Sequence, residues 1–286
     1  MKLLQFHTPD GVHFGVLDEN GVFDVTAASC GRIDMAGLFC GKHRDELERL
    51  LAEAPKERLP FESLHLAPCV PKPGKIIGVG LNYVYYMEAQ HLPLPPFPHL
   101  FPKFGESLRA SGEPVAVPRG SVQTDFEGEL AVVIGKRARC VSKENALEHV
   151  FGYCSANDLT ARDFQDETPS WVPGKCCNGF TPLGPYLTTA DEVPDPYALR
   201  VRAWVNGELR QDFCTDDMIR DIHFLISGIS RYFTLNPGDV LLTGTSVGHI
   251  MLDPPERRRW LTPGDVVEVE VEGLGRLVTP FVEDSL

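Results

Sequence analysis

A short segment at residues 124–135, with the sequence TDFEGELAVVIG, constrains the fold more than any other part of the chain. Residues 130–134 form an unbroken apolar run that ends at a glycine, which is typical of a buried strand. Glu127 and Glu129 stand just before this run, and side chains two positions apart on a strand point to the same face. Like charges held that close raise each other's pKa unless a cation lies between them. The segment alone leaves two interpretations open, a divalent metal site and a strand end with two solvated glutamates.

Composition narrows the class of protein. The 286 residues, of which 43% are hydrophobic, suffice for one large domain or for a small and a larger one. The net charge of -13 and the lack of a long Lys/Arg run argue against nucleic acid or an anionic membrane as partner. No apolar stretch is long enough to span a bilayer, and the start of the chain has too short an apolar core for a signal peptide. We expect a soluble, cytoplasmic protein that binds a small molecule.

The eight cysteines agree with that location. They form no C-x-x-C pair and have no regular spacing, which argues against a zinc site or a disulfide scaffold and fits a reducing compartment. Cys176 and Cys177 lie close in sequence to candidate site residues, and we interpret them as buried bystanders.

The first quarter of the chain has the pattern of a small separate unit. Three short apolar runs within the first 25 residues are separated by turn sequences and predict a meander. Residues 44–54 carry leucines at helical spacing and predict a helix. Several prolines then mark a connector. We therefore predict a small N-terminal domain at residues 1–70 and a catalytic domain at residues 71–286.

The rest of the chain is rich in strand signals. Asn206-Gly207 between two apolar runs is a strong hairpin signal, and residues 267–272 alternate Val and Glu like a half-exposed strand. Thr215 is expected to cap a helix that runs to about Tyr232. Residues 93–98 hold too many prolines for regular structure. These signals predict an α+β fold that is mainly β, with antiparallel or mixed sheets.

Three acidic side chains form the candidate metal site. Glu127, Glu129 and Asp158 together offer only oxygen ligands, which suit Mg²⁺ or Mn²⁺, or Ca²⁺ in a crystal, rather than zinc or copper. An octahedral ion held by three protein ligands keeps about three open positions, which water or two oxygens of a chelating substrate can fill. Such an ion can polarise a carbonyl or hold an enolate.

Further polar residues are candidates for binding the substrate. Lys175, between glycine-containing turns, and Arg162 can hold the anionic end of a small acid. Thr245 and Gln165 can donate hydrogen bonds to it. From spacing alone this set is a weak prediction, because acidic and polar residues are abundant in the chain.

Five motifs follow one another in order along the chain. They are residues 80–83 (GLNY), 125–135 (DFEGELAVVIG), 157–165 (NDLTARDFQ), 174–175 (GK) with 181–185 (TPLGP), and 242–245 (LTGT). Together they closely resemble the fumarylacetoacetate hydrolase family in its short two-domain form. The resemblance covers roughly residues 70 to 283.

The resemblance implies a fold and a set of roles. It implies a mixed β-sandwich or β-roll catalytic domain, usually a homodimer, with Mg²⁺ or Mn²⁺ in the site. The family's metal ligands fall on Glu127, Glu129 and Asp158. Tyr83, in the first motif, is a further candidate for substrate binding. The positions that line the family's substrate pocket fall on Lys175, Gln165 and Thr245.

One expected pair of residues is absent. Hydrolases of this family usually continue the Asn-Tyr of the first motif with a histidine three residues later and a glutamate three residues after that, which resemble a water-activating dyad on a lid. Here these positions hold Tyr86 and Ala89. Tyrosine has a reference pKa near 10 and is a poor general base at neutral pH. Glu88 is one residue out of register, which on a helix turns it away from the expected face.

Three accounts of this replacement remain open. Glu88, His91 or His99 activates water on a rearranged lid, and the protein cleaves a C–C bond in an acylpyruvate-like acid through a metal-held enolate, as the family default implies. Alternatively, the protein is a decarboxylase or a keto–enol isomerase of a 2-oxo dicarboxylate, which needs no activated water. In the third account it binds metal and ligand without turnover. The candidate catalytic residues are Lys175, Glu88, Tyr86 and His91.

Overall fold

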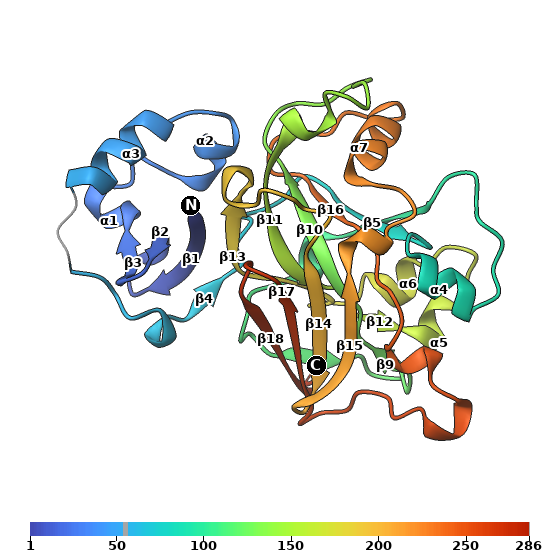
Figure 1. Cartoon of the computed structure of the whole chain (residues 1–286). Helices are drawn as coiled ribbons and strands as arrows, with labels where there is room; N and C mark the ends of the chain where they lie inside the picture. Colours follow the sequence, from blue (N-terminus) through green and yellow to red (C-terminus); the bar gives the residue numbers. More distant parts are fainter. Residues whose placement is uncertain (54–56, 286) are drawn as a thin grey trace.

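A computed structural model describes residues 1–53 and 57–285 (Figure 1). The strands, in chain order, are β1 Lys2–Thr8, β2 Gly11–Asp18, β3 Gly21–Asp24, β4 Leu66–Ala67, β5 Ile76–Gly80, β6 His99–Lys103, β7 Leu108–Arg109, β8 Val115–Val117, β9 Thr124–Asp125, β10 Gly128–Ile134, β11 Val150–Asn157, β12 Thr160–Ala161, β13 Thr181–Thr189, β14 Arg200–Val205, β15 Glu208–Cys214, β16 Val240–Leu242, β17 Val266–Val271 and β18 Arg276–Glu283. The α-helices are α1 Val25–Ser29, α2 Met35–Phe39, α3 Arg44–Glu53, α4 Val84–Ala89, α5 Arg162–Gln165, α6 Val172–Lys175 and α7 Ile222–Ser230.

Two sheets make up most of the described chain. The larger has the strand order β3-β2-β1-β13-β11-β10-β16-β5-β6, with β4 on β1 and β7 on β13. Most of its pairs are antiparallel, but β16–β5 and β13–β7 are parallel. The smaller sheet has the order β15-β14-β17-β18-β8 and packs beside the centre of the larger one (Figure 1). The predicted mainly β, α+β fold with mixed sheets is confirmed, as is the hairpin at Asn206-Gly207, which joins β14 to β15.

Strand β10 is the centre of the core. All seven of its residues are buried, because its apolar side chains enter two different clusters. Ala131 and Val133 pack into one cluster with β1, β13 and α2, whereas Leu130, Val132 and Ile134 pack into another with α7. Since successive side chains on a strand point to opposite faces, an unbroken apolar run is what a strand covered on both faces requires.

The N-terminal segment contains the predicted meander, β1 to β3, and a helix, α3, at the predicted place. The last residue of the predicted helix, Ala54, lies outside the described residues. Strand β1 also pairs with β13, so the large sheet continues from the N-terminal segment into the rest of the chain (Figure 1). The domain boundary near residue 70 stays a prediction.

The predicted start of the helix at Thr215 was wrong. Thr215 opens only a single 3-10 turn, and α7 begins at Ile222. The N-cap is Asp221, whose carboxylate accepts a hydrogen bond from the backbone N–H of Phe224 at 2.7 Å. The helix ends at Ser230, before the predicted Tyr232.

The residues between Thr215 and α7 are extended because they serve another segment. Met218 forms an isolated bridge with Tyr83, and the N–H of Ile219 donates to the carbonyl of Asn82 at 2.8 Å. The Asn82 side chain in turn accepts from the N–H of Arg220. These long-range bonds use the backbone groups that a longer helix would need. Tertiary hydrogen bonds therefore prevent the helix that the local spacing predicts.

Within the described residues, no helix is long and apolar enough to cross a membrane. The longest two, α3 and α7, have 10 and 9 residues. The cytoplasmic location stays a prediction.

The cap of α7 is testable. We expect Asp221→Ala to lower the free energy of unfolding by about 1 kcal/mol, because it removes the acceptor for the first turn of the helix. Asp221→Asn is the matched control, since it keeps an acceptor and removes only the half-exposed ion pair with Lys143. Urea unfolding followed by circular dichroism measures both, and a wild-type midpoint for Asp221→Ala would show that the cap contributes nothing.

Candidate metal and substrate site

Three carboxylates meet at the edge of the central strand. Glu127 precedes β10, Glu129 lies in it, and Asp158 follows β11. The antiparallel pairing of β10 and β11 brings Asp158 beside Glu127, and the Asp158 N–H donates to the Glu127 carbonyl at 2.9 Å. One oxygen of each carboxylate lies within 4.8 Å of the other two, and all three residues are buried.

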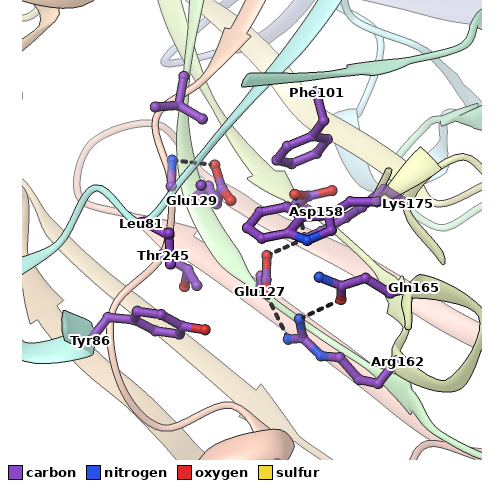
Figure 2. Close-up of a pocket in the computed structure, with 14 residues that line it drawn as sticks. Leu81, Tyr86, Phe101, Glu127, Glu129, Asp158, Arg162, Gln165, Lys175 and Thr245 are labelled. Carbon is purple, nitrogen blue, oxygen red and sulfur yellow. Dashed lines mark hydrogen bonds and ion pairs between the residues drawn. The ribbon is translucent and has the colours of Figure 1, made fainter. Parts of the chain in front are cut away.

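Lysine and arginine side chains compensate two of these carboxylates. Lys175 donates to Glu127 Oε2 at 2.6 Å and to Asp158 Oδ2 at 2.7 Å, so its ammonium lies between them (Figure 2). Lys103 forms an ion pair with the other oxygen of Asp158, and Arg162 donates to Glu127 Oε1 at 2.6 Å. Although burial favours the neutral amine, Asp158 and Glu127 raise the pKa of Lys175 above its ordinary value.

Glu129 has no such partner. Its Oε2 accepts from the N–H of Gly244 at 2.7 Å, and its Oε1 has no hydrogen-bond partner among the described residues. Burial, reinforced by the charges of Asp158 and Glu127, raises the pKa of Glu129 well above its ordinary value. A buried carboxylate beside two others, with a free oxygen, fits a hard divalent cation. Carboxylate oxygens have two lone pairs each, so Glu127 and Asp158 can bind an ion while still accepting from lysine.

The turn that holds Glu129 depends on glycine. Gly244 has φ +97°, a left-handed conformation that favours glycine. A Cβ at this position would lie 2.8 Å from the carbonyl oxygen of Val79. The backbone of the 242–245 motif can therefore approach both β5 and Glu129, which explains why this motif accompanies the acidic segment.

A second layer of charge holds Arg162. Asp125 accepts from Arg162 Nε at 3.0 Å and Nη2 at 2.9 Å, and His249 Nδ1 lies 3.1 Å from the same carboxylate. Burial alone would raise the pKa of Asp125, but Arg162 and His249 hold it well below its usual range. Because Arg162 bonds both Asp125 and Glu127, the arrangement favours a role in positioning Glu127 over the predicted direct hold on the substrate.

Fourteen residues line a small cavity over the three carboxylates (Figure 2). Thr245 lies in its wall, but its hydroxyl already donates to the Gly128 carbonyl and accepts from Gln211. Gln165 accepts from Arg162 through Oε1, which leaves its amide N–H₂ without a partner among the described residues. The predicted residues on the wall are Glu127, Glu129, Asp158, Lys175, Arg162, Gln165, Thr245 and Tyr86.

Tyr86 comes from the helix α4 and enters the cavity on the side away from Lys175 (Figure 2). Its ring stacks on that of His249, with the centroids 5.6 Å apart and the planes at 23°. Burial raises the pKa of Tyr86 above its ordinary value, so the phenol keeps its proton at neutral pH. The residue that replaces the family histidine is thus a hydrogen-bond donor and not a base.

The structure does not bring three of the predicted residues to the cavity. Glu88 and His91 line a separate groove on the outer side of α4, and both are exposed. Tyr83 is fully buried with its ring against Phe213, at a centroid distance of 5.2 Å. Their predicted roles have no support from this geometry. His99 is also outside the lining, although its ring lies 4.0 Å from the cavity residue Trp171.

Sequence reasoning missed Lys103, His249 and the role of Asp125. Lys103 ends an alternating strand, β6, in which Phe101 and Lys103 are the two buried side chains. That pattern is a usable signal, because a lysine on a buried face needs an acid partner. His249 follows the 242–245 motif without any local pattern that marks it.

Comparison with known proteins agrees with this geometry. The family model for the fumarylacetoacetate (FAA) hydrolase C-terminal region matches residues 75–282, most of the chain. The chain belongs to the fumarylacetoacetate hydrolase family. One relative, the human mitochondrial oxaloacetate tautomerase FAHD2A, is 36% identical to this chain, over 99% of this chain and 92% of its own length.

Solved structures of family members share the whole fold. Fumarylacetoacetate hydrolase from Exiguobacterium antarcticum is 34% identical with a TM-score of 0.85, over 99% of this chain and all of that chain. Maleylpyruvate hydrolase from Sphingobium sp. SYK-6, solved with manganese(II) and pyruvate, is 30% identical with a TM-score of 0.82 over the full length of both chains. Members of the family thus include hydrolases and tautomerases, and the predicted family and fold are confirmed.

The unpaired charge of Glu129 gives a test that needs no substrate. A carboxyl whose pKa is raised in the folded state binds its proton more tightly there, so its contribution to stability is full below the ordinary Glu pKa and is lost as pH rises through the folded value. We expect metal-free Glu129→Gln to unfold at a higher temperature than wild type at pH 8, by roughly 2–4 °C, and by less at pH 5.

The same variant tests the metal ligand. Mg²⁺ or Mn²⁺ is expected to raise the unfolding temperature of wild type and to leave that of Glu129→Gln unchanged, as measured by scanning calorimetry. Glu148→Gln, at an exposed position outside the cavity, is the control and should respond like wild type. Equal metal shifts in Glu129→Gln and wild type would refute the assignment of Glu129 as a ligand.

Proposed function

We propose that the protein is a divalent-metal-dependent keto–enol tautomerase of a small 2-oxo dicarboxylate of the oxaloacetate class. One observation carries this choice over the hydrolase that the sequence first suggested. Among the described residues that line the cavity there is no histidine, and the only carboxylates are the three that face one another. Hydrolysis needs a general base for water, whereas tautomerisation only moves a proton between carbon and oxygen of one molecule.

The metal fits the residues present. Glu127, Glu129 and Asp158 would hold Mg²⁺ or Mn²⁺, and the ion would act as a Lewis acid for the two adjacent oxygens of a 2-oxo acid. The manganese and pyruvate found in the Sphingobium hydrolase support this kind of ion and of ligand. The name of the human relative supports the reaction.

The chain's own side chains supply positioning and proton transfer. Lys175 and the amide N–H₂ of Gln165 are placed to bind the substrate carboxylates. Lys175 Nζ, held as an ammonium by two carboxylates within 2.7 Å, is also the proposed proton carrier. In ketonisation it donates a proton to the carbon, and the proton that leaves the enol oxygen restores the ammonium; the reverse transfers form the enol. The phenol of Tyr86 points into the cavity and is proposed to donate a hydrogen bond to the oxygen at which the enol forms. The proton lost by the carbon beside the ketone is regained at that oxygen, so no water, oxidant or second substrate is consumed.

The stacking of Tyr86 on His249 supports the same assignment. His249 is fully buried and is held by Asp125, so it gives the Tyr86 ring a fixed platform. A group fixed in this way costs little entropy to orient at the moment of reaction. The helix α4 thus contributes a hydrogen-bond donor, Tyr86, to the cavity wall where the family hydrolases have a base.

Hydrolysis of an acylpyruvate is the second candidate, and the likeness to maleylpyruvate hydrolase over the full chain favours it. Decarboxylation and ligand binding without turnover are further outcomes. Two substrates separate them. With oxaloacetate, ketonisation lowers the enol absorbance without loss of carbon, whereas decarboxylation releases CO₂ together with pyruvate. With an acylpyruvate, hydrolysis releases pyruvate and no CO₂. The homodimer stays a prediction.

Tyr86→Phe tests the role of the phenol. This change keeps the ring on His249 and removes the hydroxyl, so we expect the kcat for Mg²⁺-dependent tautomerisation of oxaloacetate to fall roughly 100-fold with little change in KM. Tyr85→Phe removes a hydroxyl from the neighbouring, 57% exposed tyrosine and should leave the rate unchanged. Loss of enol absorbance with time is the measurement, and equal rates for Tyr86→Phe and Tyr85→Phe would exclude Tyr86 from the reaction.

Restoring the family dyad tests why hydrolysis is disfavoured. Tyr86→His combined with Ala89→Glu is expected to raise acylpyruvate hydrolysis by about 10-fold or more, because it supplies the missing base on α4. Tyr86→His with Ala89→Gln, which has the same shape without the charge, should give a smaller gain. Pyruvate release is the measurement. If neither variant exceeds wild type, the lid has diverged beyond these two positions.

A further inference from the structure

A second group of possible metal ligands lies at the surface, away from the cavity residues. His7 in β1, His65 just before β4, and Glu113 in the turn between β7 and β8 each offer one ligand atom, and these atoms lie within 4.8 Å of one another. Both histidines are exposed and Glu113 is half-buried. The three residues are far apart in sequence, so only the fold brings them together.

The backbone beneath this group is firmly held. The N–H of His7 donates to the carbonyl of His65 at 2.8 Å, next to the pairing of Phe6 with Leu66 in β1 and β4. Phe6, Leu66 and Ala110 belong to one buried cluster under the site. The positions from which the three side chains start are therefore set by core packing and not by the side chains themselves.

The side chains themselves are free to bind. The His7 and His65 rings are tilted by 37° at a centroid distance of 4.8 Å, and their nitrogens make no hydrogen bond to the described residues. Glu113 Oε2 accepts from the Ala110 N–H at 2.8 Å, which fixes the carboxylate and leaves Oε1 open. Two imidazoles and an oriented carboxylate thus converge with lone pairs unused.

We propose that His7, His65 and Glu113 bind a zinc ion, with water in the remaining position. Zinc lies about 2.0–2.2 Å from imidazole nitrogen and carboxylate oxygen, which puts tetrahedral ligands roughly 3.4 Å apart. The ligand atoms now lie within 4.8 Å of one another, and small rotations of the two exposed rings would bring them to the shorter separation. Imidazole favours zinc over Mg²⁺, so Mg²⁺ is expected to fill only the all-carboxylate site, whereas zinc, which carboxylates also bind, is expected to fill both. The cysteine spacing argues only against zinc held by cysteines and does not bear on this group.

The ion would join three segments. It would connect β1, the chain leading into β4, and the turn at residues 110–113, which belongs to the part of the chain that matches the family model. Such a link binds the folded state and not the unfolded chain, so it stabilises the protein in proportion to zinc occupancy. We assign it a structural role that is independent of the proposed tautomerase.

Zinc titration by calorimetry on the full chain tests the site. The carboxylate site also takes up zinc, so the expected stoichiometry is two zinc ions for wild type, one for His65→Asn, one for Glu129→Gln, and none for the double variant. Zinc should raise the unfolding temperature of Glu129→Gln by a few degrees and leave that of the double variant unchanged. With Mg²⁺ in place of zinc, His65→Asn should keep the wild-type tautomerase rate, so failure of one proposal does not decide the other.

Three further variants serve as controls. His223→Asn removes a histidine elsewhere on the surface and should still bind two zinc ions, whereas Glu113→Gln should lose one without touching an imidazole. His65→Cys should restore the second ion, because a thiolate is also a zinc ligand. Equal stoichiometry in His65→Asn and wild type would overturn the proposal. So would zinc binding to Glu129→Gln that is weaker than about 1 mM, which would show an adventitious ion only.

Discussion

The structure depends on the negative charge buried at one end of strand β10. Glu127, Glu129 and Asp158 are nearly inaccessible. Among the described residues, the cations that pair with them are Lys103, Lys175 and Arg162, and none of these bonds Glu129. Burying a carboxylate without a partner is costly, and a fold tolerates it when a ligand removes the cost. A hard cation would remove this cost for Glu129, and in its absence a proton does so, as the raised pKa of Glu129 indicates.

Most of the architecture around the site serves to hold this charge in place. The β10–β11 pairing sets two of the carboxylates side by side, and the left-handed turn at Gly244 supplies an N–H to the third. Behind them, Asp125 fixes Arg162, which fixes Glu127. The alternation of acid and base in this chain of contacts lets each buried charge stabilise its neighbour. Second-layer groups of this kind are known to orient the side chains that bind a metal.

The proposed reaction rests on what the cavity lacks as well as on what it holds. The helix α4 places Tyr86 against the ring of His249, where its phenol is a hydrogen-bond donor, and Glu88 and His91 line the separate groove. The same metal centre is compatible with cleavage, decarboxylation and tautomerisation, because all three develop negative charge at the same oxygens. In the proposed function, the side chains on α4 select among these reactions.

The sequence by itself determined the central strand, the hairpin at Asn206-Gly207, the convergence of Glu127 with Glu129, and the family, because each of these rests on local spacing or on ordered motifs. Only the tertiary structure decided which cations compensate the carboxylates, where α7 begins, and which way Glu88 and His91 face. Lys103, His249 and Asn82 act through partners more than 50 residues away in the chain. Periodicity describes one element at a time, whereas charge compensation and backbone pairing between elements depend on packing that no local pattern encodes.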